Sequence, residues 1–277
     1  MSKESWDIAG VSVAGFARPE SGTGCQDAHV IAVTDGGWFV GVASDGAGSA
    51  ARGSDGANLV AQVVVREMMN RLEREHHDIV LQVDSTRLWL EDAIERARTE
   101  VAQIADAPGA GKQMRDFHAT VVGAVAGQRG GVLFHIGDGA AFAAESCDLT
   151  SFVLSLPENG EYLNSTYFFT EEYWRSHLRL RSFDERYDLI ALMSDGVTPF
   201  ALGAGGRSPF APFFQPLNEF LVQHDRAGRE KAITTILQRD AVRRITHDDK
   251  TLVWALRHPR PTTPTELSHS VASLDPA

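Results

Sequence analysis

The sequence predicts an α+β domain in which two antiparallel sheets are packed in layers. Short apolar strands come in runs joined by glycine-rich turns, and between and after those runs lie longer segments with apolar residues three and four positions apart. Strands joined by hairpins form antiparallel sheets, whereas a parallel doubly wound fold alternates single strands with helices. The order of elements suits two sheets packed face to face with helix pairs outside, a four-layer α-β-β-α sandwich.

The first elements are three strands. Residues 8–16, 28–34 and 38–44 are short apolar segments of the kind that form strands. Asp35-Gly36-Gly37 separates the second strand from the third and is a hairpin signal. Residues 17–26 are rich in Gly, Pro and Ser and are expected to form a loop.

The hydrophobic period then changes to that of helices. After a tight turn at 45–49, residues 54–75 and 85–105 carry apolar side chains at helical spacing. Ser85 is a candidate N-cap for the second helix. Residues 106–115 are expected to form a loop.

Strands return in the second half of the chain and are followed by helices and a last strand. We expect strands at 117–126, 131–137, 139–145, 187–194 and 251–257, and helices at 212–224 and 228–244. Residues 150–186 are rich in aromatic side chains without a clear period, and we expect an irregular, variable flap there. We therefore predict a single domain over residues 1–257 and a disordered tail over residues 258–277, which are rich in Pro, Thr and Ser.

Composition excludes several classes of protein. The formal net charge is −11, from 37 acidic and 26 basic residues, which disfavours nucleic acid and anionic membranes as partners. The two cysteines do not make a disulfide framework, and no signal peptide or membrane-spanning apolar run is visible. We expect a monomeric, cytoplasmic protein.

The most informative feature is an aspartate that recurs at the edges of apolar strands. The positions are Asp27, Asp45, Asp138, Asp195 and the pair Asp248 and Asp249. Carboxylates gathered in one cleft suit Mg²⁺ or Mn²⁺. Two such cations would activate a water for in-line attack on a phosphate and neutralise the phosphate charge. Each single Asp-Gly is also an ordinary turn dipeptide, and spacing alone leaves both interpretations open.

Six segments, in order, resemble the metal-dependent protein phosphatases of the type 2C family (PPM), in particular a bacterial sub-branch. They are Cys25-Gln26-Asp27-Ala28, Ala43–Gly48, His118–Val122, His135–Gly139, Leu192–Val197 and Asp248–Thr251. No single segment is specific, but six in this order are specific together. The resemblance spans residues 8–257 and implies the four-layer sandwich and hydrolysis of phosphoserine or phosphothreonine on proteins.

The resemblance also implies roles for the matched residues. Asp45 would bridge two Mn²⁺ or Mg²⁺ ions, the Gly46 carbonyl would bind one of them, and Asp27 would act there through water. Asp195 and Asp248 would bind the other ion, and Asp138 would serve a third, weaker position. Thr120 and Ser194 are then structural neighbours of the ligands. Implied partners are a phosphorylated protein substrate and, by association, a cognate Ser/Thr kinase.

The chain departs from the family pattern at three positions. Gly22 occupies the place of a phosphate-binding arginine, for which Arg18 is the nearest substitute, and Pro199 occupies the place of an acidic ligand for the third ion. Ala47 replaces a histidine proposed as general acid, and His247 is an alternative proton donor. Cys25 lacks the phosphate loop of a cysteine phosphatase.

These departures keep two other functions open. One is a pseudophosphatase that binds a phosphoprotein or a kinase without turnover. The other is a metal-dependent hydrolase of a different small phosphate ester. The flap over residues 150–186 is the candidate element for substrate choice.

Overall fold

The computed structural model describes residues 5–15, 24–75, 79–107, 111–157 and 166–258. Within them, two five-stranded sheets contain only antiparallel pairs. In spatial order the first sheet contains β1 (Trp6–Val13), β10 (Lys250–Arg257), β9 (Leu189–Met193), β6 (Ala140–Glu145) and β7 (Asp148–Ser155). The second contains β2 (Ala28–Val33), β3 (Phe39–Ser44), β4 (Val121–Gly127), β5 (Gly130–Ile136) and β8 (Arg179–Phe183).

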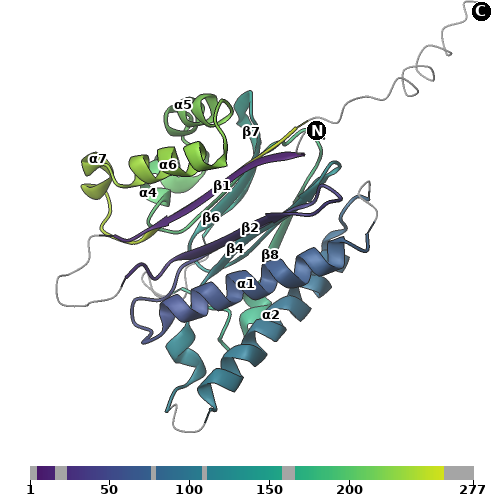
Figure 1. The fold of residues 1–277 in the computed structure, drawn as a ribbon, viewed down its shortest axis with the longest axis vertical. Helices are drawn as coiled ribbons and strands as arrows, with labels where there is room; N and C mark the ends of the chain where they lie inside the picture. Colours follow the sequence, from purple (N-terminus) through teal and green to yellow (C-terminus); the bar gives the residue numbers. More distant parts are fainter. Residues whose placement is uncertain (1–4, 16–23, 76–78, 108–110, 158–165, 259–277) are drawn as a thin grey trace, which may run out of the picture.

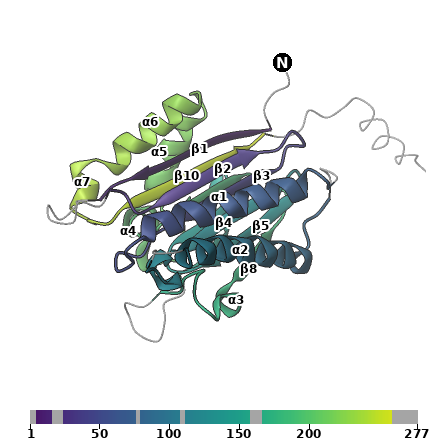
Figure 2. The ribbon, with the colours of Figure 1, turned by 60° about the horizontal axis from the view of Figure 1, so that its bottom comes forward.

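Helices cover the outer face of each sheet. The pair α1 (Gly53–Leu72) and α2 (Val83–Ala105) lies over the second sheet, and α5 (Ala211–Leu221) and α6 (Arg226–Leu237) lie over the first (Figures 1 and 2). Shorter segments are η1 (Met114–Phe117), α3 (Trp174–His177), α4 (Thr198–Ala201), η2 (Ala204–Gly206) and α7 (Asp240–Arg243). The predicted four-layer α-β-β-α sandwich is confirmed.

Three apolar layers hold this arrangement together. One lies between the two sheets and includes Phe39, Leu133 and Leu192, and the other two lie between each sheet and its helices. Strands β3, β4, β5 and β9 are buried at every residue because a helix layer covers one face and the opposite sheet covers the other. Burial on both faces explains why these strands are continuous apolar runs in the sequence.

The predicted irregular structure of residues 150–186 is wrong in part. The strands β7 and β8 and the short helix α3 lie within or across this range, and residues 158–165 lie outside the described part of the chain. Both strands are at sheet edges, so they are only partly buried. Polar residues such as Arg179 and Arg181 therefore interrupt the alternation by which a strand is recognised.

Two helix predictions also need correction. The second helix begins at Val83, with Gln82 as the N-cap residue and no side-chain cap, so Ser85 lies inside the first turn. Leu81 is buried two positions before the first helical residue and packs in the core beneath the helix pair. The helix predicted over 228–244 is two helices, because α6 ends at Leu237 and Arg239 is extended (ψ 144°) before α7.

The C-terminal end of β10 is tied to the start of the chain. His258, the first residue of the predicted tail, donates its backbone N–H to the Ser5 carbonyl at 2.9 Å, and its ring lies 3.0 Å from Asp7. Residues 259–277 lie outside the described ranges. Of the helices in those ranges, none combines the length and apolar character that crossing a membrane requires.

Candidate active site

The strand ends that carry the predicted aspartates meet at one end of the sandwich. In the second sheet Ala28 pairs with Ser44, so Asp27 before β2 and Asp45 after β3 flank the same end. In the first sheet Leu252 pairs with Met193, which brings Asp195 after β9 and Asp248 before β10 together. Antiparallel pairing therefore gathers carboxylates that are far apart in the sequence.

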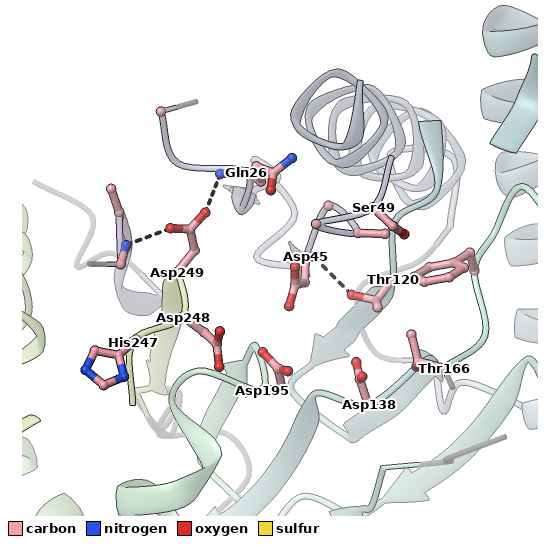
Figure 3. Close-up of a pocket in the computed structure, with 17 residues that line it drawn as sticks. Gln26, Asp45, Ser49, Thr120, Asp138, Thr166, Asp195, His247, Asp248 and Asp249 are labelled. Carbon is pink, nitrogen blue, oxygen red and sulfur yellow. Dashed lines mark hydrogen bonds between the residues drawn. The ribbon is translucent and has the colours of Figure 1, made fainter. Parts of the chain in front are cut away.

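A cleft of about 380 Å³ opens at this end (Figure 3). Its lining includes residues from both sheets, among them Asp45, Gly46, Asp138, Asp195 and Asp248. Four of the predicted aspartates and the predicted carbonyl ligand thus share one cleft. The lining also includes Ala47, Gly48, Ser49, Thr166 and Phe168.

Thr120 holds Asp45 in place. The Asp45 backbone N–H donates to Thr120 Oγ1 at 3.0 Å, and the Thr120 N–H donates back to the Asp45 carbonyl at 2.9 Å. The Ser44 hydroxyl donates to the Thr120 carbonyl at 2.6 Å. Thr120 is thus a hydrogen-bonding support for the aspartate at the end of β3, the position expected of a structural neighbour.

Two glycines let the loops of the cleft approach one another closely. A Cβ atom at Gly46 would lie 2.4 Å from the backbone carbon of Gly53, at the start of α1. A Cβ atom at Gly196 would lie 1.9 Å from the Asp249 carbonyl oxygen. Each separation is below van der Waals contact, so only glycine allows the loops after Asp45 and Asp195 to pack as they do.

Ser194 and Thr251 join the other two aspartate-bearing segments. The Ser194 N–H donates to the Thr251 carbonyl at 3.1 Å, and the Thr251 N–H donates to Ser194 Oγ at 2.9 Å. This reciprocal pair continues the β9–β10 ladder beyond its last strand residue. The ends of β9 and β10 that lead to Asp195 and Asp248 are therefore held together by hydrogen bonds.

Asp249 has a function that sequence reasoning missed. Its Oδ1 accepts the Gly15 backbone N–H at 2.6 Å, and its Oδ2 accepts the Gln26 backbone N–H at 2.5 Å (Figure 3). Both ends of the segment between β1 and β2 are thereby tied to the start of β10. The available signal was the second aspartate of Asp248-Asp249, where the family motif has asparagine.

Asp27 lies behind the cleft wall with 5% of its surface exposed. Among the described residues, no hydrogen-bond partner of normal geometry reaches either carboxylate oxygen. Burial, with smaller contributions from the charges of Asp249 and Asp195, raises the pKa of Asp27 to about 7 against the opposing effect of the Ser194 and Thr251 hydroxyls. A buried carboxylate without partners is costly unless a cation or a proton compensates it.

The cleft aspartates raise one another's pKa values. Burial, then Asp27 and Asp195, raise the pKa of Asp45 well above its usual range. Burial and Asp195 raise the pKa of Asp138 to about 6, and the pKa of Asp195 is also raised, first by burial. Crowded like charges of this kind are stabilised by divalent cations.

The donor set fits cations that retain much of their water. Among the residues that the structure describes, no group of three or more His, Cys, Asp or Glu side chains is arranged so that it could hold a metal ion alone. Mg²⁺ is usually bound through one or two carboxylates with several waters. A cleft ringed by carboxylates, with an orphaned oxygen on Asp195 and two on Asp27, suits that mode of binding.

The other candidate residues are less central. His247 lines the cleft beside Asp248, and Ala47 lines it without contributing a polar side-chain group. Pro199 lies in the first turn of α4, while Arg18 and Gly22 lie outside the described residues. Burial and the charges of Asp249 and Asp27 raise the pKa of the Cys25 thiol to about 12, which argues against a catalytic thiolate.

Comparison with known proteins identifies the family. Residues 14–238 match the family model described as protein phosphatase 2C. The chain belongs to the protein phosphatase 2C family. The predicted family and the predicted enzyme class, a protein serine/threonine phosphatase, are confirmed.

Relatives of this phosphatase 2C chain agree. It is 29% identical over 270 residues to serine/threonine-protein phosphatase 3 of Escherichia coli (strain K12), covering 91% of this chain and 98% of that one. A crystal structure of a bacterial serine phosphatase aligns with a TM-score of 0.60 at 15% identity, over 92% of this chain and 99% of the other. Staphylococcus aureus serine/threonine phosphatase Stp1 aligns at 0.58 and 15% identity, over 91% and 94% of the two chains.

A third solved structure is RsbX, described as a complex with magnesium. It aligns with a TM-score of 0.54 at 13% identity, over 93% of this chain and 98% of that chain. Structural matches at such low identity establish the shared fold. Arguments about the reaction of this chain therefore rest on the residues of its own cleft.

Proposed function

We propose that this phosphatase 2C chain is an active hydrolase of phosphoserine and phosphothreonine on proteins, dependent on Mn²⁺ or Mg²⁺. The observation that carries the proposal is the convergence of Asp45, Asp138, Asp195 and Asp248 on one cleft. Asp27, buried behind it without a hydrogen-bond partner among the described residues, supplies a further negative charge.

In this proposal the carboxylates would hold two divalent cations. Asp45 would contribute to both positions, the Gly46 carbonyl and Asp27 to one, and Asp195 and Asp248 to the other. Asp138 would serve a third, weaker position. Bound cations would lower the pKa of a water and neutralise phosphate charge during in-line attack.

An inactive binding module is the second candidate function. Ala47 favours it, because that position lacks a side chain that can protonate the leaving alcohol, a function worth roughly 10²–10⁴ in rate. Against it, every position proposed for the two principal ions keeps its aspartate, and Asp249, Thr120 and Ser194 hold three of the aspartate-bearing segments in place. The retained site favours the active enzyme.

The test is hydrolysis of p-nitrophenyl phosphate and of a phosphothreonine peptide with millimolar Mn²⁺. We expect turnover that chelator abolishes and that Asp45→Ala and Asp195→Asn each reduce at least 100-fold, the order expected for removing one electrostatic stabiliser. Asp35→Asn is a matched control, because Asp35-Gly36 is the same dipeptide at the opposite end of β3 and is exposed.

Two results would count against the proposal. Manganese binding without turnover on either substrate would favour the pseudophosphatase. Turnover on nucleotides with none on phosphopeptides would favour the hydrolase of a small phosphate ester.

Further features of the molecule belong to the same proposal. We infer one catalytic domain over residues 1–257, acting as a cytoplasmic monomer on a phosphorylated protein and paired with a Ser/Thr kinase. Thr166 and Phe168 of the predicted flap line the cleft, which supports a role for this segment in substrate choice.

A further inference from the structure

The lining of the cleft is strongly acidic. It includes five aspartates, and among the described lining residues His247 is the only side chain that can carry a positive charge. The whole chain has a net charge of −11. A phosphoprotein that approaches this end of the molecule therefore meets a negative field outside the cation positions.

A basic groove shares one wall with the cleft. It has a volume of about 400 Å³ and is lined by Asp240, Arg243, Arg244 and His247. His247 also lines the cleft, so the two depressions are adjacent. Two arginines thus lie next to an otherwise acidic site.

The arginines belong to α7 and the turn after it, and buried side chains hold this segment against the domain. Val242 and Thr246 are each 7% exposed, four residues apart on the inward side of α7 and the turn after it. Thr246 Oγ1 lies 3.3 Å from Asp248 Oδ2, which links the segment to the cleft. Arg243 and Arg244, on the same segment, are exposed.

The arginines are chemically suited to a ligand carboxylate or phosphate. A guanidinium donates in a planar fork that matches either group in bidentate fashion. The pair between Arg243 and Asp240 is 3.6 Å long with side chains 45% and 82% exposed. Exposed pairs of this kind contribute little energy, so the contact with Asp240 does not by itself exclude a ligand anion.

We propose that this groove is a substrate subsite that binds an acidic side chain close to the phosphorylated residue. The inference rests on the proposed phosphatase function and names its substrate class: phosphoproteins in which Asp, Glu or a second phosphorylated residue flanks the target. Because His247 lines both the cleft and the groove, the acidic side chain would lie near the phosphorylated residue in the peptide sequence. Ile245, 54% exposed, offers an apolar contact in the same segment.

The test compares three phosphothreonine peptides that differ only in flanking residues: a pair of Asp, a pair of Asn and a pair of Lys. The variant is Arg243→Gln with Arg244→Gln. The matched control is Arg129→Gln with Arg186→Gln, which removes the same charge from exposed arginines, each within 4.0 Å of a carboxylate. These control residues lie in the β4–β5 and β8–β9 turns, at the end of the sandwich opposite the cleft.

We expect the unmodified protein to prefer the Asp peptide over the Asn peptide by about tenfold in kcat/KM at low salt, through KM. The double variant loses this preference, the control variant keeps it, and about 0.5 M salt suppresses it by screening. The subsite would be overturned if the double variant kept its preference for the Asp peptide. It would also be overturned if the unmodified protein had the same kcat/KM for the Asp and Asn peptides.

A binding measurement separates this inference from the proposed function. Fluorescence anisotropy of the labelled peptides with Mn²⁺ reports the subsite without turnover. Arginine-dependent binding of the Asp peptide without hydrolysis would keep the subsite and refute the enzyme. Hydrolysis with the same affinity for all three peptides would keep the enzyme and refute the subsite.

Discussion

Oδ2 of Asp249 accepts the backbone N–H of Gln26 at 2.5 Å, across a separation of 223 residues. The other oxygen of the same carboxylate accepts Gly15 N–H. One side chain directly before β10 therefore holds the segment that leads into β2 and carries Asp27. The position of one proposed ligand depends on a residue that need not touch a cation.

Replacing Asp249 by asparagine is expected to loosen this connection. The amide nitrogen of asparagine cannot accept a hydrogen bond, so one of the two backbone N–H groups loses its partner. We expect Asp249→Asn to cost about 1.5–3 kcal/mol in urea unfolding and to raise the Mn²⁺ concentration for half-maximal activity. Asp148→Asn is the control. Among the described residues that exposed carboxylate accepts hydrogen bonds only from Thr150, through one oxygen that asparagine retains, so we expect a change within about 0.5 kcal/mol. Equal effects for both variants would contradict the assigned role.

The carboxylate cluster predicts an unusual dependence of stability on pH. The folded-state pKa of Asp27, about 7, lies above the unfolded value near 4, so the folded state binds this proton more tightly. Its contribution to stability is therefore complete below about pH 4 and is lost as pH rises through about 7.

Asp27→Asn isolates this effect. In chelator, we expect the variant to become more stable than the unmodified protein between pH 5 and pH 8, as followed by thermal unfolding. Saturating Mn²⁺ should raise the Tm of the unmodified protein most at pH 8, and that of the variant less. A difference between the two proteins that does not change with pH would refute the assignment.

His135 predicts a loss of stability in acid. Burial, aided by Arg179, lowers the pKa of this fully buried histidine well below its usual value, and its Nδ1 lies 3.0 Å from Ser155 Oγ. Its contribution to stability is complete above pH 6.5 and is lost as pH falls below that, at up to about 1.4 kcal/mol per pH unit. We expect His135→Gln to show a weaker pH dependence of the urea midpoint between pH 7.5 and 5.5. An unchanged dependence would exclude this histidine as its source.

Gly196→Ala tests the contact between the loops that carry Asp195 and Asp249. A methyl group placed 1.9 Å from the Asp249 carbonyl oxygen must displace backbone, and we expect a cost of at least about 2–3 kcal/mol in urea unfolding together with weaker Mn²⁺ activation. Gly24→Ala is the control, because among the described residues no heavy atom outside Gly24 and its chain neighbours lies within 4 Å of the added Cβ atom, and Gly24 also lines the cleft. Equal losses of stability and of Mn²⁺ activation in the two variants would show that the close approach of Gly196 to the Asp249 carbonyl does not require glycine.

Much of the fold was predictable because its signals are local. Strands such as β3 and β9 are buried on both faces and therefore appear as apolar runs, while α1 and α2 carry apolar residues at helical spacing. The aspartates beside these strands, and their order along the chain, were also visible, and that order pointed to the family. The edge strands β7 and β8 were not predicted, because they are partly exposed and therefore lack a continuous apolar run.

The three-dimensional arrangement settled what depends on contacts between distant segments. Strand pairing decided that Asp27, Asp45, Asp195 and Asp248 lie at one end of the sandwich, and burial placed Asp27 behind the cleft. The sequence showed Asp249 but not its hydrogen bonds to Gly15 and Gln26, and it did not show that the groove lined by Arg243 and Arg244 lies beside the cleft. A sequence pattern indicates which face of each helix or strand is buried, because burial selects apolar residues locally. The residues of a site come from distant segments, and only tertiary packing brings them together.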